Sequence, residues 1–232
     1  MSFNCAGINY VDLPNSGLNF EQNEFSISAW VCFDVYIGHD QCFFANSKED
    51  GYGVWFREQS DNFDCTKPGI TDQYVGWSPP PATGAWYHVA AVQHYSAGAP
   101  SSVDYYLNGS YYGTYTDGNP YNSSVGQTAA LGYEPYGVFN GALQDVAVFG
   151  RALSAGEVAA LYGGGTPPTP SLSAAPWSSG LIAGWRLDDL DQSNGATAAD
   201  FSGNGLAGAY VAPPPPWQSN AFRSTQVTGA LR

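Results

Sequence analysis

Two strand-like segments at opposite ends of the chain place the strongest constraint on how it can fold. The first is the opening segment, residues 2–14, and the second is the closing segment, residues 226–232. Joined tail to head they form one plausible pair of β-strands, whereas apart each exposes a row of unpaired backbone N–H and C=O groups. The sequence therefore predicts a domain whose opening strands sit at its C-terminus. Such a domain either folds back on itself or completes a neighbouring copy of the chain.

The composition is typical of an all-β protein rather than a helical one. The 232 residues include 28 glycines, 16 prolines, 16 tyrosines and 7 tryptophans, as expected of aromatic strands joined by many turns. This length suits one large β domain or two small ones, and it supplies enough apolar residues for a sizeable core.

The chain is strongly acidic, with 20 Asp and Glu residues against 7 Lys and Arg and a formal net charge of −13. Nucleic-acid partners are not expected, because phosphates require clustered basic side chains. Docking on an anionic membrane surface is disfavoured for the same reason. No apolar run reaches the length of a membrane-spanning helix, so membrane insertion is not expected either.

The four cysteines are candidates for disulfides, and they are Cys5, Cys32, Cys42 and Cys65. None lies in a CxxC pair, so a zinc site is not expected. Cys32 and Cys42 flank a short turn region and could face each other across a hairpin. An even number of cysteines suits an oxidising, extracellular setting, and the alternative is four buried thiols.

Alternation of apolar and polar residues predicts a series of short strands. The clearest is residues 25–33, and residues 86–92 form a continuous apolar run typical of a central strand. Asn108-Gly109 predicts a tight hairpin turn. The other expected strands are residues 42–45, 53–56, 103–107, 111–115, 129–132, 141–149, 180–187 and 206–211.

One helix, a linker and a tail complete the predicted organisation. Ser154 is a good N-cap and Glu157 completes a capping box, so a helix is expected over residues 154–162. Residues 163–179 are rich in glycine and proline and are expected to form an extended linker spanning roughly 50 Å. The tail, residues 180–232, is too short to close a β-sandwich alone.

Taken in order, several segments resemble one known family, and these are residues 25–31, 86–90, 103–109, 141–154, Glu157 and 161–162. They resemble the laminin-G-like, concanavalin A-like lectin jelly-roll family over residues 8–162. The resemblance implies an all-β antiparallel jelly-roll β-sandwich with one short helix near residues 154–162. Residues 181–188 and 199–205 resemble the opening of the same domain, so the family's N-terminal segment is displaced to the C-terminus.

This displacement implies a role in assembly. Residues 1–162 would form an incomplete sandwich with exposed sheet edges, and residues 180–232 would complete it in a neighbouring subunit or in the same chain. Donation to a neighbour predicts a non-enzymatic homopolymer, a head-to-tail filament that is extracellular or on a virion surface. The alternatives are a monomeric, circularly permuted lectin-like module that binds glycans or cell surfaces, and a fragment of a tandem-domain adhesin.

The resemblance also bears on chemistry. Some relatives hydrolyse glycans with paired carboxylates on one strand, but Glu21 and Glu24 precede the strand and lack the intervening Asp, so catalysis is not expected. Family members often bind calcium at a rim, and carboxylate and amide oxygens suit this ion. The candidate calcium ligands are Asp188, Asp189, Asp191, Asn194, Asp200 and Asn204. The alternative is a solvated acidic loop followed by an Asx-type turn.

Glycan binding is the family's commonest non-structural role, and aromatic side chains stack on sugars. The candidates are Trp77, Tyr111, Tyr112, Tyr115, Tyr121, Tyr133 and Tyr136, of which most are expected to serve packing. The chain could also carry sugars itself. Asn108 and Asn122 fit the N-glycosylation pattern, and Thr166, Thr169 and Ser171 lie among prolines that suit O-linked sugars.

Overall fold

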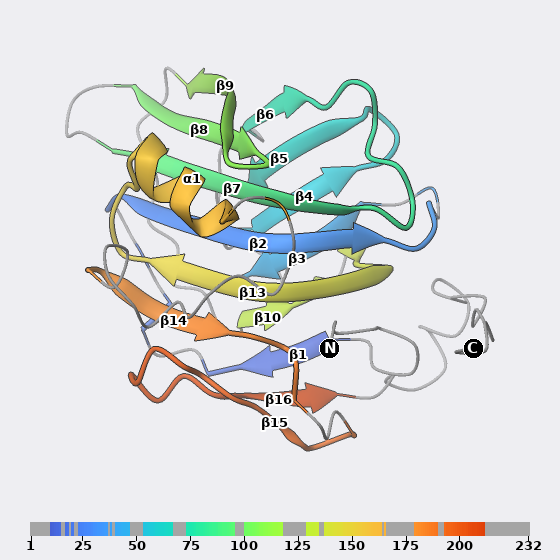
Figure 1. Cartoon of the computed structure of the whole chain (residues 1–232), viewed down its shortest axis with the longest axis vertical. Helices are drawn as coiled ribbons and strands as arrows, with labels where there is room; N and C mark the ends of the chain where they lie inside the picture. Colours follow the sequence, from blue (N-terminus) through green and yellow to red (C-terminus); the bar gives the residue numbers. More distant parts are fainter. Residues whose placement is uncertain are drawn as a thin grey trace.

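The computed structural model of the chain consists of two antiparallel β-sheets packed face to face, with one short helix on the outside (Figure 1). It describes residues 10–14, 17–18, 20, 23–36, 38, 40–46, 53–66, 73–95, 100–117, 129–134, 137–163, 165, 179–189 and 193–211. The predicted fold class, an antiparallel jelly-roll sandwich with one short helix, is confirmed.

The first sheet has eight strands in the order β15-β16-β1-β10-β3-β4-β5-β6. Their bounds are β1 Tyr10–Leu13, β3 Gln41–Ala45, β4 Gly53–Arg57, β5 Asn62–Thr66, β6 Gln73–Gly76, β10 Ala129–Leu131, β15 Thr197–Ala198 and β16 Gly208–Val211. A small hairpin, β11 Tyr133–Glu134 and β12 Gly137–Val138, lies against β3.

The second sheet has six strands in the order β14-β13-β2-β7-β8-β9. Their bounds are β2 Phe25–Phe33, β7 Trp86–His94, β8 Ser101–Leu107, β9 Ser110–Asp117, β13 Gly141–Phe149 and β14 Leu181–Trp185. The strand β2 coincides with the predicted residues 25–33, because every second residue from Phe25 to Phe33 is apolar.

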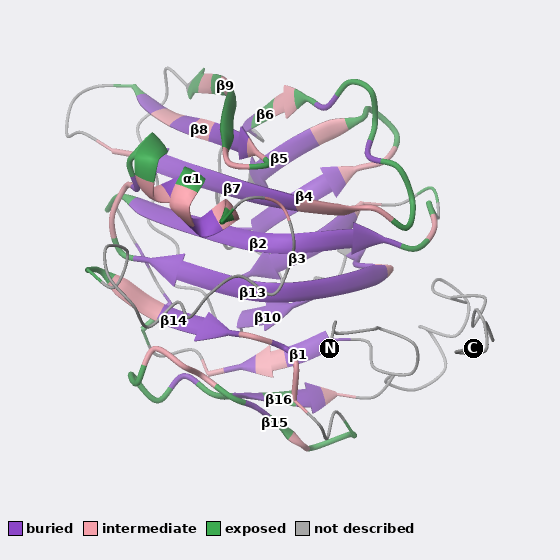
Figure 2. Ribbon diagram, viewed as in Figure 1, coloured by how far each residue is buried: buried purple, intermediate pink, exposed green. Residues whose placement is uncertain are grey.

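The core lies between the two sheets. Alternate residues of β2, from Phe25 to Phe33, point into it and meet aromatic side chains of the eight-stranded sheet. The ring of Phe33, for example, packs edge-on against Phe43 and Phe56 at centroid distances of 5.8 and 5.3 Å. Every residue of β2 and β13 is buried, so both faces of the six-stranded sheet are covered here (Figure 2). Each fully buried large apolar side chain contributes about 1.5–3 kcal/mol.

The helix α1, Ala155–Tyr162, covers part of the outer face of the six-stranded sheet (Figure 1). It begins after Ser154, whose hydroxyl accepts from the Glu157 N–H in a complete capping box, and ends at Gly163 in the left-handed conformation. Val158 and Leu161 pack on the sheet beneath. The prediction of a capped helix is confirmed.

His88 lies on the same covered face. Its Nε2 atom lies 2.9 Å from Ser28 Oγ, and its ring packs against those of Trp30 and Tyr162. Burial lowers the pKa of His88 to about 3, so the imidazole stays neutral. This placement agrees with a structural, hydrogen-bonded role.

The described part of the tail lies in the sheets of its own chain. Strand β14 pairs with β13 at the edge of the six-stranded sheet, and β16 pairs with β1 in the eight-stranded sheet. Trp185 is fully buried and donates from Nε1 to the Leu206 carbonyl at 2.9 Å. Donation of this segment to a neighbouring subunit finds no support in this arrangement, in which it completes its own sandwich.

The opening strand does pair with a C-terminal segment, although with a different one from that expected. Tyr10, Val11 and Asp12 pair with Val211, Tyr210 and Ala209. The predicted partner, residues 226–232, lies outside the described residues.

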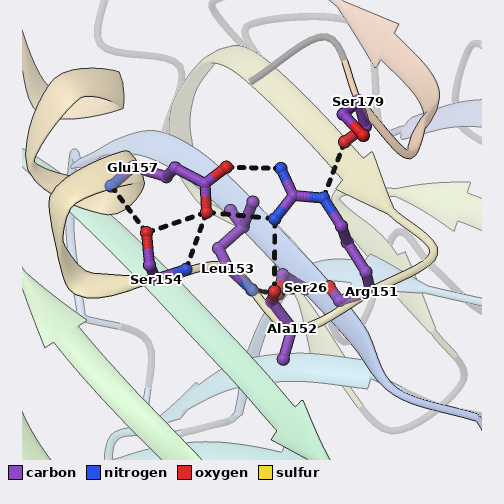
Figure 3. A network of polar contacts seen from close by, with 7 residues as sticks. All are labelled: Ser26, Arg151, Ala152, Leu153, Ser154, Glu157 and Ser179. Atoms are coloured by element: carbon purple, nitrogen blue, oxygen red, sulfur yellow. Dashed lines mark hydrogen bonds and ion pairs between the residues drawn. The ribbon is translucent and has the colours of Figure 1, made fainter. Parts of the chain in front are cut away.

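A polar network ties the end of β13 to α1 and to the start of the tail (Figure 3). The Arg151 guanidinium donates to both carboxylate oxygens of Glu157, at 3.0 and 2.5 Å, and its Nε donates to the Ser179 carbonyl at 2.7 Å. Ser26 Oγ donates to the Arg151 carbonyl and accepts from the Leu153 N–H. The network therefore fixes the point where the tail enters the sandwich.

The described cysteines do not form disulfides with one another. Cys32, Cys42 and Cys65 are buried thiols, whereas Cys5 lies outside the described residues. Cys32 is in β2 and Cys42 is in β3, so the turn between them joins two different sheets. The expected pairing across a hairpin is therefore not supported. Within the described ranges, no helix is long and apolar enough to cross a membrane.

Candidate functional site

A group of exposed tyrosines lies where the two sheets meet at β6 and β9. Among described residues, the large hydrophobic side chains that are exposed are all tyrosines: Tyr36 (37%), Tyr74 (46%), Tyr111 (58%) and Tyr112 (36%). Tyr74 is in β6, and Tyr111 and Tyr112 are in β9, where the half-buried Tyr115 joins them. We call Tyr74, Tyr111, Tyr112 and Tyr115 the tyrosine surface. Figure 2 shows its strands at the edge of the molecule farthest from β15 and β16.

Local sequence explains how β9 presents its tyrosines. Asn108 and Gly109 take positive φ values of 49° and 73°, which form the tight turn that returns the chain from β8. A register shift between Tyr105 and Tyr106 then leaves Tyr112 as one extra residue of β9. Gly113 follows, and a Cβ there would lie 3.1 Å from Val75, so β9 approaches β6 closely.

The tyrosine rings are held in place by contacts with the protein. The rings of Tyr74 and Tyr115 are 5.7 Å apart with an interplanar angle of 36°. Tyr111 packs edge-on against Tyr106 at 5.9 Å, and the Tyr112 hydroxyl accepts from the Ser78 N–H at 3.0 Å. A ligand that stacks on these rings would lose little side-chain entropy, since the rings are already oriented.

Polar groups flank the surface on the side of the eight-stranded sheet. Asp64 pairs in register with Tyr74, so their side chains leave the same face about 5 Å apart. Arg57 Nε lies 2.6 Å from Asp64 Oδ2 and its NH1 atom lies 3.8 Å from Asp40 Oδ2. The side chains of Arg57 and Asp40 are 30% and 29% exposed, so both can contact a ligand bound beside Tyr74.

A second polar chain flanks the surface on the six-stranded sheet. The Tyr111 hydroxyl lies 2.7 Å from Thr114 Oγ1, and Thr114 in turn donates to Asp104. His94 Nε2 lies 3.0 Å from Asp104 Oδ2, and its Nδ1 lies 3.9 Å from Glu24. These contacts fix the tilt of Tyr111 and leave its ring exposed.

The aromatic residues singled out from the sequence divide into two groups. Trp77 and Tyr133 are 4% and 6% exposed and serve packing, while Tyr111, Tyr112 and Tyr115 lie in β9 at the surface. Tyr121 and Tyr136 lie outside the described residues. The sequence reasoning missed Tyr74, although Gln73-Tyr74-Val75-Gly76 before a buried Trp is a short strand signal that could have revealed it.

Among the described residues, the aspartates proposed as calcium ligands do not form a group of three. Both Asp200 oxygens accept hydrogen bonds: Oδ1 from the N–H groups of Gly184 and Ser202, and Oδ2 from Ser202 Oγ and the Leu206 N–H. Burial raises the pKa of the Asp200 carboxyl, but these hydrogen bonds outweigh it and hold the pKa below its ordinary value. Asp200 thus organises the turn that follows β15.

The remaining candidates are spread around this turn. Asn204 Nδ2 donates to the carbonyls of Leu181 and Ile182 at 3.1 and 2.8 Å, and Asp189 accepts from the Tyr210 hydroxyl at 2.8 Å. Asp188 is half-buried, Asn194 is exposed and Asp191 lies outside the described residues. Within the described part of the chain, no three His, Cys, Asp or Glu side chains are grouped so that they could hold a metal. Calcium binding stays a prediction.

The glycosylation candidates are only partly described. Asn108 is exposed in the β8–β9 turn, where its Oδ1 accepts from the His88 N–H at 3.0 Å. Asn122, Thr166, Thr169 and Ser171 lie outside the described residues. Sugar attachment therefore stays a prediction at each position.

Residues 6–159 match the family model of the concanavalin A-like lectin/glucanases superfamily. The chain belongs to this superfamily. The resemblance predicted from the strand and helix segments is confirmed, and the family model ends before the tail begins. No curated protein sequence matches the chain.

Solved structures share this fold at low sequence identity. A putative carbohydrate-binding protein from Bacteroides ovatus has a TM-score of 0.61 and 17% identity, over 88% of this chain and 58% of that one. A heptameric SAP-like pentraxin from Limulus polyphemus has a TM-score of 0.52 and 15% identity, over 89% and 96%. Domain 4 of an extracellular arabinanase from Geobacillus stearothermophilus, in complex with arabinotriose, has a TM-score of 0.51 and 20% identity, over 63% and 69%.

These likenesses establish the fold of this superfamily member and no more. The aligned part covers little more than half of the Bacteroides protein, at 58% of its length. Two of these three structures involve sugars: one is a putative carbohydrate-binding protein, and the other is a domain in complex with arabinotriose.

Proposed function

We propose that this protein is a non-catalytic carbohydrate-binding domain that works outside the cell as a monomer, and that it binds glycan chains on the tyrosine surface. The observation that carries the proposal is the exposure of Tyr74, Tyr111 and Tyr112 on the adjacent strands β6 and β9. Membership of a lectin-like superfamily and the sugar-related structural neighbours support it.

Tyrosine suits this role because a sugar ring has one apolar face made of C–H groups. The face of an aromatic ring is electron-rich and attracts these C–H groups, while the phenol hydroxyl can hydrogen-bond the sugar's own hydroxyls. The exposed side chains of Arg57 and Asp40 provide a donor and an acceptor beside Tyr74. A binding site of this kind needs few polar groups, provided that they are well placed.

Energetics set the expected affinity. If two rings and two hydrogen bonds each contribute on the order of 1 kcal/mol, the sum of about 4 kcal/mol corresponds to a Kd of about 1 mM. Affinity should therefore rise with chain length, because a longer glycan can contact several rings at once.

The test is isothermal titration with oligosaccharides of increasing length, using the wild type and Tyr74→Ala. We expect Tyr74→Ala to weaken binding by about tenfold, which corresponds to roughly 1.4 kcal/mol. Tyr36→Ala is the matched control, because Tyr36 is also an exposed tyrosine, at 37%, but lies outside the tyrosine surface. Equal affinities of wild type and Tyr74→Ala for every glycan bound would refute the proposed site.

Native mass spectrometry tests the monomeric part of the proposal. A species of 24.6 kDa is expected, because β14 and β16 already complete the chain's own sheets. Long assemblies that persist on dilution would instead favour exchange of the tail between copies.

A further inference from the structure

The charges around the tyrosine surface bear on which glycans it accepts, an inference that rests on the proposed function. The carboxylates linked to it in the described part of the chain are Glu24, Asp40, Asp64 and Asp104. Among the described residues, Arg57 is the basic side chain beside them, and it is paired with Asp64 and Asp40. His94 is placed between Asp104 and Glu24.

These carboxylates are connected to the tyrosines through short chains of contacts. Asp64 pairs in register with Tyr74, and Asp104 accepts from Thr114, which contacts the Tyr111 hydroxyl. Negative charge therefore lies beside Tyr74 on the eight-stranded sheet and beside Tyr111 on the six-stranded sheet.

A surface of this kind repels anions and attracts cations at distances up to about 10 Å at 0.1 M salt. Like charges brought together at a binding interface cost up to several kcal/mol. An ammonium group, by contrast, gains from a carboxylate and also from the electron-rich face of a tyrosine ring. The formal net charge of −13 extends the same preference over the whole molecule.

We propose that the tyrosine surface selects glycans by charge: it prefers chains that carry protonated amino groups, such as glucosamine polymers, accepts uncharged chains, and rejects chains that carry carboxylates or sulfates. The tyrosine rings supply the contact with the sugar faces, and the surrounding carboxylates supply the selection.

The experiment compares three β-1,4-linked hexasaccharides that share one backbone and differ in charge: glucosamine, glucose and glucuronic acid. Titration at about pH 5.5 keeps the amines protonated and exposed carboxylates ionised. We expect affinity to fall in that order, with the glucosamine chain at least tenfold tighter than the glucuronic acid chain. Raising the salt concentration should narrow this difference several-fold.

Charge variants separate selection from stacking. The double variant Glu24→Gln/Asp104→Asn removes the two carboxylates on either side of His94 next to Tyr111, and it should reduce the preference for the amino-bearing chain. Asp188→Asn removes the same type of charge beyond β14, on the far edge of the sandwich, and should leave the preference unchanged. Tyr74→Ala should lower the affinity for every hexasaccharide that the wild type binds.

The outcomes distinguish this inference from the proposed function. Equal binding of the glucuronic acid and glucosamine chains, with loss of both in Tyr74→Ala, would overturn the charge selection and leave glycan binding intact. Failure of all three chains to bind would overturn both. Binding of polylysine as tight as that of the glucosamine chain, and unaffected by Tyr74→Ala, would show general attraction of cations and would also overturn the inference.

Discussion

The two edges of the sandwich use the same type of side chain in opposite ways. At the edge formed by the tail, Tyr210 and Trp185 are fully buried, and their polar atoms bond to Asp189 and to the Leu206 carbonyl. At the edge formed by β6 and β9, Tyr74 and Tyr111 are 46% and 58% exposed. The first edge is where aromatic residues stabilise the fold, and the second is where they are available to a ligand. The proposed function would thus place stability and recognition at opposite ends of the same two sheets.

The strongest challenge to this comparison is removal of Trp185. We expect Trp185→Ala to lower the free energy of unfolding by about 3–5 kcal/mol, since a large buried side chain and a buried hydrogen bond are both lost. Chemical denaturation measures this effect, with Tyr111→Ala as the exposed aromatic control. A loss below about 1 kcal/mol would show that β14 is not part of the cooperative core.

The second prediction concerns Asp200, which holds the tail edge together through four hydrogen bonds to both its oxygens. Asp200→Ala leaves the N–H groups of Gly184 and Leu206 without this acceptor, so we expect a loss of about 2–3 kcal/mol. Ser202→Ala, which removes one of these donors, should cost about 1 kcal/mol in the same measurement. Equal effects of the two variants would contradict the central role given to the carboxylate.

The third prediction uses pH to test the network at the entry of the tail. The Arg151 side chain lowers the pKa of Glu157 from 4.5 to about 2, with help from Ser154. A lowered pKa in the folded state means that the ionised carboxylate stabilises the fold above the unfolded pKa, and that this contribution is lost as the pH falls towards 2.

The measurement compares melting temperatures of the wild type and Glu157→Gln across this range. At neutral pH we expect the variant to be less stable by about 1 kcal/mol, the usual cost of a lost cap or partly exposed ion pair. The difference should shrink as the pH is lowered from 4.5 towards 2. A difference that stays constant with pH would show that the ion pair contributes nothing to stability.

The smallest effect on stability is expected at the edge formed by β6 and β9, where we propose that glycans bind. Tyr74→Ala should change the free energy of unfolding by no more than about 0.5 kcal/mol, because half of the side chain is already in solvent. The same variant is expected to weaken glycan binding, so denaturation and titration on one sample sharpen the contrast between the two edges. A large loss of stability would mean that Tyr74 belongs to the core after all.

Local sequence patterns were sufficient for the central elements of this fold. Residues 25–33 and 141–149 are nine-residue runs rich in apolar residues, and Ser154 with Glu157 carries a complete capping signal, so β2, β13 and α1 were predicted within a residue of their bounds. Asn108-Gly109 likewise predicted the β8–β9 turn. In each case the signal lies within a short stretch of chain.

The edges were harder to predict, because they depend on contacts between distant parts of the chain. Strands β5 and β6 are short and carry polar residues such as Asn62, Asp64 and Gln73, which hide their alternation. The partner of β1 is β16, some 200 positions away, and no local pattern distinguishes it from residues 226–232. The tyrosine surface was predicted only in part for the same reason. Tyr74 and Tyr115 belong to different sheets, and their rings come into contact only where the two sheets meet.

The pairing of β1 with β16 also has a mechanical consequence. Tyr10 lies opposite Val211, so the chain enters one strand and leaves the other at the same end of the ladder. A force that pulls these two points apart would load the hydrogen bonds one rung at a time, as in a zipper, rather than all together in shear. The edge formed by the tail should therefore be the first to open under tension.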